Sequence, residues 1–135
     1  ATFGDHAEYR FNQTEGGVQY QGIEVGWLPE GYELVRSRIS DETEQRCYVK
    51  SVNGAEQRID VQIMSFAGEG IFKIDTEADD VYQILVQNAL ATVIERGSCI
   101  QITWMYPESN CIVMLYSDNI SAETALRIAQ SIVLS

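Results

Sequence analysis

Residues 25–32 read Val-Gly-Trp-Leu-Pro-Glu-Gly-Tyr and combine turn-forming residues with two aromatic anchors more tightly than any other part of the chain. Pro29 fixes its own φ and favours an extended conformation in the residue before it, while Gly31 gives the backbone the freedom to begin a new strand. The order Leu-Pro-Glu-Gly fits a type I turn, with Pro at the second position and Gly at the fourth. Trp27 and Tyr32 flank the turn, and each can bury a large ring. We therefore expect an architectural hinge without catalytic residues.

The chain on either side of this hinge shows strand patterns. Before it, residues 18–25 alternate around Gly22, which is typical of a short strand interrupted by a bulge. After it, alternation predicts a strand that ends near Ile39. This strand is expected to place Tyr32, Leu34 and Arg36 on one face and Val35 and Ser37 on the other.

Asn53-Gly54 predicts the clearest hairpin, because Asn-Gly is the preferred pair for a two-residue type I′ turn. Its strands are expected over residues 46–52 and 55–66. A two-residue loop fixes the register by counting outward from the turn. The expected pairs are Val52 with Ala55, Tyr48 with Ile59 and Arg46 with Val61.

The second half of the chain contains further strands, the first of them short, over residues 71–74. Residues 81–95 combine helical spacing with many β-forming side chains, and we interpret them as two strands joined by a turn at Gln87-Asn88. Residues 100–106 alternate strictly and lead into a four-residue turn. A loop of this length places Tyr106 opposite Cys111 and Trp104 opposite Val113.

This last hairpin has two apolar faces, and Trp104 shares one of them with Ile102, Val113 and Leu115. The other face carries Met105, Ile112, Met114 and Tyr116 and is too apolar to be fully solvated. Residues 121–134 have a broad apolar stripe and a capping serine, so they are expected to form a helix that covers this second set. Trp104, Met105, Met114 and Tyr116 are interpreted as core under that helix, or alternatively as an apolar groove for a partner segment or lipid.

Together these patterns predict an α+β fold, a curved, mainly antiparallel sheet of about six or seven strands with the C-terminal helix packed on one face. The strands come in runs with short turns and only one helix is expected, which disfavours parallel βαβ units. Residues 26–135 are expected to form this domain. Residues 1–17 show no sustained period, and residues 1–25 are expected to be an N-terminal segment of the same domain.

The 135 residues include nine basic and twenty acidic side chains, which gives a formal net charge of −11 and a pI near 4.3. Phosphate backbones and anionic lipids repel such a chain, so neither nucleic acid nor direct membrane binding is expected. No window reaches the ~20 apolar residues of a membrane span, and the N-terminus lacks the pattern of a signal peptide. We expect a soluble chain, either alone or as the excised soluble part of a longer protein.

Residues suited to catalysis or metal binding are sparse. His6 is the single histidine, and Cys47, Cys99 and Cys111 have no short ligand spacing, so neither a Cys–His nucleophile pair nor a zinc site is expected. The cysteines are interpreted as small buried apolar residues, with one intramolecular disulfide or functional thiol chemistry as the alternatives.

Asp75, Glu77 and Asp79 alternate as in a calcium-binding loop. However, the sixth position of such a loop is Asp80 instead of glycine, and the twelfth is Val86 instead of glutamate. A solvated connection is therefore the main interpretation, with adventitious calcium binding as the alternative. We expect no cofactor, no metal ion and no catalytic residue.

An ordered set of motifs is similar to that of a known family. Gly26-Trp27-Leu28-Pro29-Glu30-Gly31-Tyr32-Glu33-Leu34 is followed by a hairpin that contains Tyr48, by Ile102-Thr103-Trp104, and by a helix with the pattern Ser-x-Glu-x-x-x-x-Ile-Ala-x-Ser-Ile from Ser121. In this order they resemble the bacterial domain of unknown function 4367, over residues 26–133. Family members often have Asn-Gly near the position of Asn88-Ala89, where this chain has no glycine.

The resemblance implies a place outside the cytoplasmic membrane of Gram-positive bacteria, after a single membrane helix, in proteins that resemble anti-sigma factors or other envelope-stress regulators. It attaches no enzymatic activity to the family. We therefore expect a non-enzymatic extracytoplasmic domain, at the cell surface or secreted, for sensing or for binding a protein partner in the envelope, and tethered in the full-length protein. The alternative is a carrier-like domain that holds an apolar ligand or lipoprotein segment between sheet and helix, and a hydrolase is the residual hypothesis.

Overall fold

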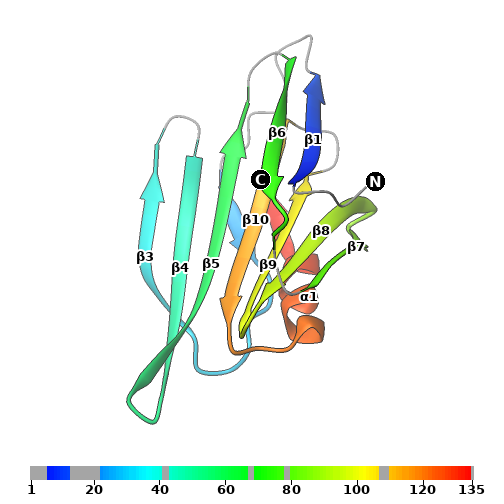
Figure 1. The fold of residues 1–135 in the computed structure, drawn as a ribbon. Helices are drawn as coiled ribbons and strands as arrows, with labels where there is room; N and C mark the ends of the chain where they lie inside the picture. Colours follow the sequence, from blue (N-terminus) through cyan, green and yellow to red (C-terminus); the bar gives the residue numbers. More distant parts are fainter. Residues whose placement is uncertain are drawn as a thin grey trace.

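The computed structural model describes residues 6–12, 22–40, 43–66, 69–77, 80–106 and 110–134. Within these ranges the chain forms strands and one helix (Figure 1). In chain order they are β1 (His6–Asn12), β2 (Ile23–Val25), β3 (Glu33–Ile39), β4 (Thr43–Val52), β5 (Ala55–Ser65), β6 (Glu69–Asp75), β7 (Asp80–Val86), β8 (Ala89–Arg96), β9 (Cys99–Met105), β10 (Cys111–Asp118), α1 (Ala122–Gln130) and β11 (Ile132–Leu134).

Seven strands form one antiparallel sheet in the order β3-β4-β5-β10-β9-β8-β7 (Figure 1). The predicted register of the Asn53-Gly54 hairpin is confirmed, since Val52 lies opposite Ala55 and Tyr48 opposite Ile59. The predicted pairing of Trp104 with Val113 is confirmed as well. The α+β fold with a mainly antiparallel sheet and a C-terminal helix is therefore as expected.

Residues 81–95 form two strands, as predicted, and the turn between β7 and β8 lies at Gln87 and Asn88. Both residues have positive φ, 53° and 65°, as the central residues of a type I′ turn require. A glutamine with positive φ is strained. At Gln87, hydrogen bonds with Gln130 at the end of α1 and with the Ile132 carbonyl oxygen compensate for this strain.

One face of the main sheet, which we name the helix face, carries the apolar core. The side chains of α1 that point toward it, Ala125, Ile128 and Ala129, are 0% exposed. Strands β2 and β11 pair with each other and contribute to the same core through Ile23 and Ile132. The sheet residues of this core include Ile59, Val61, Ile63, Ile102, Trp104, Val113 and Leu115.

The prediction that the C-terminal helix covers Met105, Ile112, Met114 and Tyr116 is wrong. These residues alternate with the core residues of β9 and β10, so they point to the opposite side, which we name the second face. The helix packs on the face of the sheet on which large apolar side chains from several strands lie together. The second face mixes Met114 and Tyr116 with polar cross-strand neighbours such as Gln62 and Gln101, and it offers a less apolar surface.

The helix is also shorter than the predicted span of residues 121–134. It begins after the N-cap Ser121, whose hydroxyl accepts a hydrogen bond from the Thr124 backbone, and it ends at Gln130. After the C-cap Ser131, residues Ile132–Leu134 form β11 and pair with β2, placing Ile132 opposite Val25. The β-branched Ile132 and Val133 favour this extended ending, and the ladder with β2 satisfies backbone groups that helical bonds would otherwise use.

Strands β1 and β6 pair with each other and pack on the second face. Ala7 and Ile74 contact Ile94 of β8 in a small apolar cluster. The hydroxyl of Tyr9 lies 2.7 Å from the Thr92 hydroxyl oxygen and donates to the Thr103 carbonyl oxygen at 2.8 Å. Strand β6 extends the predicted strand over residues 71–74 by a few residues on each side.

No helix in the described ranges is both long enough and apolar enough to cross a membrane. The predicted strand over residues 18–25 is observed only as β2, since residues 18–21 lie outside the described ranges.

Candidate functional site

The motif segment, residues 26–32, is attached at its start to the end of α1. The Gly26 backbone N–H donates to the Ser131 carbonyl oxygen at 2.9 Å. The Ser131 hydroxyl lies 3.4 Å from the Trp27 carbonyl oxygen, and the guanidinium carbon of Arg127 lies 4.0 Å from the centre of the Trp27 ring. Trp27 and Leu28 also pack against the main core.

The turn in this segment lies one residue later than predicted. Glu30 and Gly31 are the turn residues, and Gly31 has a φ of 96°, which favours glycine. A Cβ atom on Gly31 would lie 3.1 Å from the side chain of Lys50. Pro29 is half-buried beside the turn and Glu30 is exposed.

The end of the segment contacts the β4–β5 hairpin. The Nζ atom of Lys50 lies 5.9 Å from the centre of the Tyr32 ring, and the Tyr32 hydroxyl donates to Oε1 of Gln57 at 3.4 Å. The motif therefore joins α1 at one end to β4 and β5 at the other. These contacts connect the segment to the rest of the fold.

Strand β3 follows the motif segment directly. It is one of the two outer strands of the main sheet, and all seven of its residues are exposed. Its register against β4 shifts between Leu34 and Arg36. As a consequence Leu34 pairs with Tyr48 of the helix face, whereas Arg36 pairs with Cys47 of the second face. The prediction that Leu34 and Arg36 share a face is wrong, because alternation alone does not reveal a bulge.

The predicted groove residues are not all brought together. Trp104 is 0% exposed in the core under α1, and its indole Nε1 has no hydrogen-bond partner among the described residues. Met105, Met114 and Tyr116 lie half-buried on the second face, on the other side of the sheet. A single groove containing all four residues is therefore excluded by the alternation of β9 and β10.

A cluster of Cys99, Tyr116 and Asp118 on the second face was not predicted. The Tyr116 hydroxyl donates to Oδ1 of Asp118 at 2.8 Å, and Sγ of Cys99 lies 3.0 Å from the same hydroxyl and 3.2 Å from the same Oδ1. The hydrogen bonds with Cys99 and Asp118, together with burial, raise the pKa of Tyr116 above its ordinary value. The register of β9 against β10 places Cys99 opposite Asp118 and Tyr116 opposite Gln101, so counting outward from the predicted Trp104–Val113 pair could have brought these residues together.

Cys47 of β4 is buried and lies beside Asp60 of β5. Burial, followed by the hydrogen bond with Asp60, raises the pKa of its thiol to about 11. A thiol with this pKa has very little of the nucleophilic thiolate at neutral pH. None of Cys47, Cys99 and Cys111 is in a disulfide, and Cys111 is buried as well, with its Sγ 3.4 Å from the Ser65 hydroxyl.

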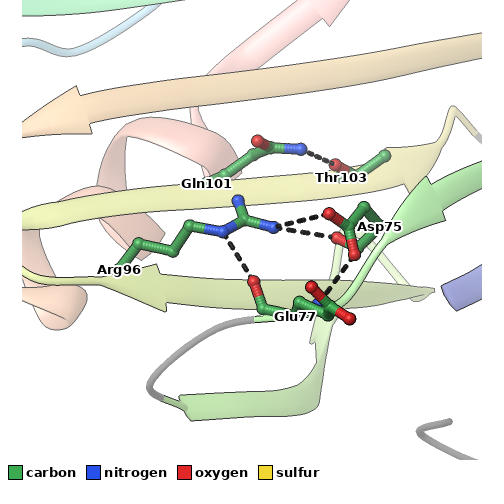
Figure 2. Close-up of polar contacts among 5 residues, drawn as sticks. All are labelled: Asp75, Glu77, Arg96, Gln101 and Thr103. Carbon is green, nitrogen blue, oxygen red and sulfur yellow. Dashed lines mark hydrogen bonds and ion pairs between the residues drawn. The ribbon is translucent and has the colours of Figure 1, made fainter. Parts of the chain in front are cut away.

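The acidic connection, for which calcium binding was the alternative interpretation, contacts the side chain of Arg96 (Figure 2). Arg96 donates through Nε to the Glu77 carbonyl oxygen at 2.8 Å and through Nη2 to the Asp75 carbonyl oxygen at 3.1 Å. The Asp75 carboxylate accepts from the Glu77 backbone N–H at 2.9 Å and lies 3.9 Å from Nη2 of Arg96. The Asp75 carboxylate, the first of the acidic groups that a calcium ion would use, thus already has a backbone N–H and a guanidinium group as partners, and Asp79 lies outside the described ranges.

A second carboxylate, that of Glu44, is fixed inside the protein at 2% exposure. It accepts from the Ile23 backbone N–H at 3.2 Å and from Nε of Arg46 at 3.2 Å, so it holds β2 against β4. Within the described ranges, no three His, Cys, Asp or Glu side chains form a group that could hold a metal ion. His6 begins β1.

These features define a mainly antiparallel α+β domain whose most distinctive segment joins α1 to the β4–β5 hairpin and in which β3, one of the two outer strands of the main sheet, is exposed along its length. A family model described as "Domain of unknown function (DUF4367)" matches residues 22–132, and the chain belongs to this family. No curated protein and no solved structure is similar enough to the chain to count as a match.

Proposed function

We propose that this chain is a non-enzymatic, extracytoplasmic domain that binds a protein partner in the cell envelope. The observation that carries the proposal is the apolar surface of β3, where Leu34 is 51% exposed, Val35 59% and Ile39 75%. Large apolar side chains that are exposed together on one element often mark a protein interaction surface. Tethering to the membrane through a preceding segment of a longer protein follows the family resemblance.

The chemistry of the described thiols and phenols supports a binding role over a catalytic one. The Cys47 thiol is kept protonated by its surroundings, with a pKa of about 11. In the Cys99 cluster, the hydrogen bonds with Cys99 and Asp118 together with burial raise the pKa of Tyr116, so its hydroxyl stays protonated and is not poised as a base.

The carrier-like alternative would need space between the main sheet and α1. The residues that meet there, among them Trp104, Leu115, Ala125 and Ile128, are all 0% exposed. A carrier with this interface must open it before any ligand can enter, whereas a surface binder needs no such step. This difference supports binding through the outside of the domain.

Protease treatment of intact cells tests the location. A protease added to cells that make the full-length protein is expected to remove this domain while a cytoplasmic control protein stays intact. Protection of the domain until the membrane is broken would contradict the extracytoplasmic placement.

A scan with a photo-crosslinking residue tests the binding role in the same cells. The residue is introduced singly at exposed apolar positions on different elements, Val35 on β3, Ile71 on β6 and Leu85 on β7. At least one position is expected to crosslink to a discrete envelope protein. The absence of a crosslink from every position would contradict the proposal.

A further inference from the structure

The outer edge of β3 has the features of a strand that accepts another strand. Because β3 is the last strand of the sheet, its N–H and C=O groups on the side away from β4 have no strand partner in the described chain. None of its seven residues is proline, so every residue retains its N–H. Natural proteins usually shorten or cover such an edge, whereas this one is long and carries exposed apolar side chains.

Because of the bulge, the paired apolar residues and the arginines of β3 lie on different faces of the sheet. Through their pairs on β4, Leu34 and Ile39 lie on the side of the helix face, whereas Arg36 and Arg38 lie on the side of the second face. A strand added beside β3 would therefore meet apolar Leu34 and Ile39 on one of its faces. On the other face it would meet Arg36 and Arg38 together with Glu33 at the start of β3.

The charge around this edge is opposite in sign to that of the whole chain. Strands β3 and β4 together contain four basic side chains and two acidic ones, although the chain as a whole has nine basic and twenty acidic residues. Charges farther than about 8 Å are largely screened at physiological salt, so a segment bound here responds mainly to the local basic groups.

In two long registers, a second copy of this chain would place like charges opposite each other at this edge. In an antiparallel pair of two β3 strands centred on Arg36, the two Arg36 side chains lie opposite each other. Centring the pair on Ser37 places Arg36 opposite Arg38. Like charges directly opposite each other destabilise a strand pair.

We propose that β3 binds an extended, acidic segment of the partner protein as an additional strand, with acidic side chains opposite Arg36 and Arg38 and apolar side chains on the side of Leu34 and Ile39. This inference rests on the proposed binding role and specifies its surface and the chemistry of the partner. The segment that fits alternates acidic and β-branched residues opposite residues 36–39, the part of β3 beyond the bulge.

Synthetic peptides of seven residues, matching the length of β3, test this specificity. One peptide alternates Glu with Val, a second alternates Lys with Val, and a third has the Glu-Val sequence with N-methyl groups on alternate backbone nitrogens. Fluorescence anisotropy of labelled peptides is expected to show binding of the first at least about tenfold tighter than of the other two. The double variant Arg36→Glu/Arg38→Glu is expected to reverse the preference between the Glu and Lys peptides, and Arg36→Lys/Arg38→Lys to keep it.

Equal binding of all peptides, binding that the charge reversal leaves unchanged, or dimerisation of the chain through β3 in ultracentrifugation would overturn the inference. Urea unfolding checks that the exposed charge variants keep the fold. The crosslinking scan separates this inference from the role on which it rests. A partner that crosslinks at Ile71 or Leu85 but not at Val35 would refute the β3 site alone, whereas no crosslink anywhere would refute both.

Discussion

The guanidinium carbon of Arg127 lies 4.0 Å from the centre of the Trp27 ring, a contact between the last turn of α1 and the motif segment. Because Gly26 and Trp27 also bond to Ser131, three interactions fasten the start of the hinge to the end of the helix. These contacts attach the motif segment, which leads directly into β3, to the end of α1.

Replacing Arg127 tests the contribution of this contact. Arg127→Ala is expected to lower the free energy of unfolding by about 0.5–1 kcal/mol, the range for a cation–π contact at an exposed site. Arg127→Lys is expected to retain part of the stabilisation that Arg127→Ala loses. In urea unfolding, Arg127→Ala in a Trp27→Leu background should have a smaller effect than in the wild type. An equal effect in both backgrounds would show that the ring does not contribute.

Replacing Gly26 tests the close approach of the two backbones. A Cβ atom at this position would lie 2.9 Å from the Ser131 carbonyl oxygen, the same atom that accepts the Gly26 hydrogen bond. Gly26→Ala is therefore expected to destabilise the domain by about 1–3 kcal/mol, since either the hydrogen bond or the backbone must shift. Gly97→Asn is the matched control, because the φ of 58° suits Asn and nothing lies within 4 Å of the added atom. A similar loss in both variants would contradict the steric argument.

Gln87 tests whether the β7–β8 turn is held by the helix end. Its side-chain Nε2 donates to the Ile132 carbonyl oxygen at 2.5 Å, and its backbone N–H donates to Oε1 of Gln130 at 3.0 Å. These bonds compensate for the positive φ of 53°. Gln87→Ala is expected to cost about 1–3 kcal/mol, because a partly buried carbonyl group loses its donor.

The control for this variant is Gln87→Asn, whose shorter side chain tolerates positive φ but does not reach Ile132. It should be nearly as destabilising as Gln87→Ala if the bond to Ile132 matters more than the turn conformation. Thermal unfolding of the three proteins provides the comparison. Full stability of Gln87→Asn would assign the effect to backbone strain instead.

The stability of the domain at high pH tests the environment of Cys47. Its thiol has a pKa raised from 9.0 to about 11, so the folded state favours the protonated thiol. This stabilisation is complete below pH 9 and is lost as the pH rises through 11, since the unfolded chain then releases its proton more readily. The loss attributable to Cys47 is expected to reach about 2 kcal/mol at pH 11.

Urea unfolding between pH 8 and pH 11 measures this loss, with Cys47→Ala as the variant. The slope of stability against pH should be shallower in Cys47→Ala than in the wild type over this interval. Tyr82, whose pKa is raised to about 12 chiefly by burial, contributes a further decline above pH 10 in both proteins. Identical slopes would show that the Cys47 thiol is solvated.

Local chemistry explains which parts of the fold could be predicted from the sequence. The Asn53-Gly54 turn determines a register by itself, and strict alternation in residues 100–106 identifies Trp104 as the partner of Val113. The face covered by α1 could not be predicted in this way, because both faces of the β9–β10 hairpin are apolar. Which face α1 covers depends on Ile59 and Ile63 of β5, and only the assembled sheet brings these two residues into the same core as Trp104.

The exposed strand and the thiol cluster show the same limit for the candidate site. The bulge between Leu34 and Arg36 breaks alternation without a glycine to mark it, so the separation of charged and apolar side chains on β3 was not visible in the sequence. Cys99 lies opposite Asp118, and Tyr116 opposite Gln101, in the β9–β10 register that the Trp104–Val113 pair already determines. The contact of Cys99 with Tyr116 then depends on the diagonal between the two pairs, which alternation within one strand does not show.

The most direct test of the account is amide hydrogen exchange of β3 with and without the Glu-Val peptide. We predict that exchange at alternate residues of Glu33–Ile39 slows at least about tenfold when the peptide is added, because the outward N–H groups acquire partners, while the β7–β8 hairpin is unchanged. Unchanged exchange along β3, or slowing confined to the interface between α1 and the sheet, would contradict a domain that binds its partner through this edge.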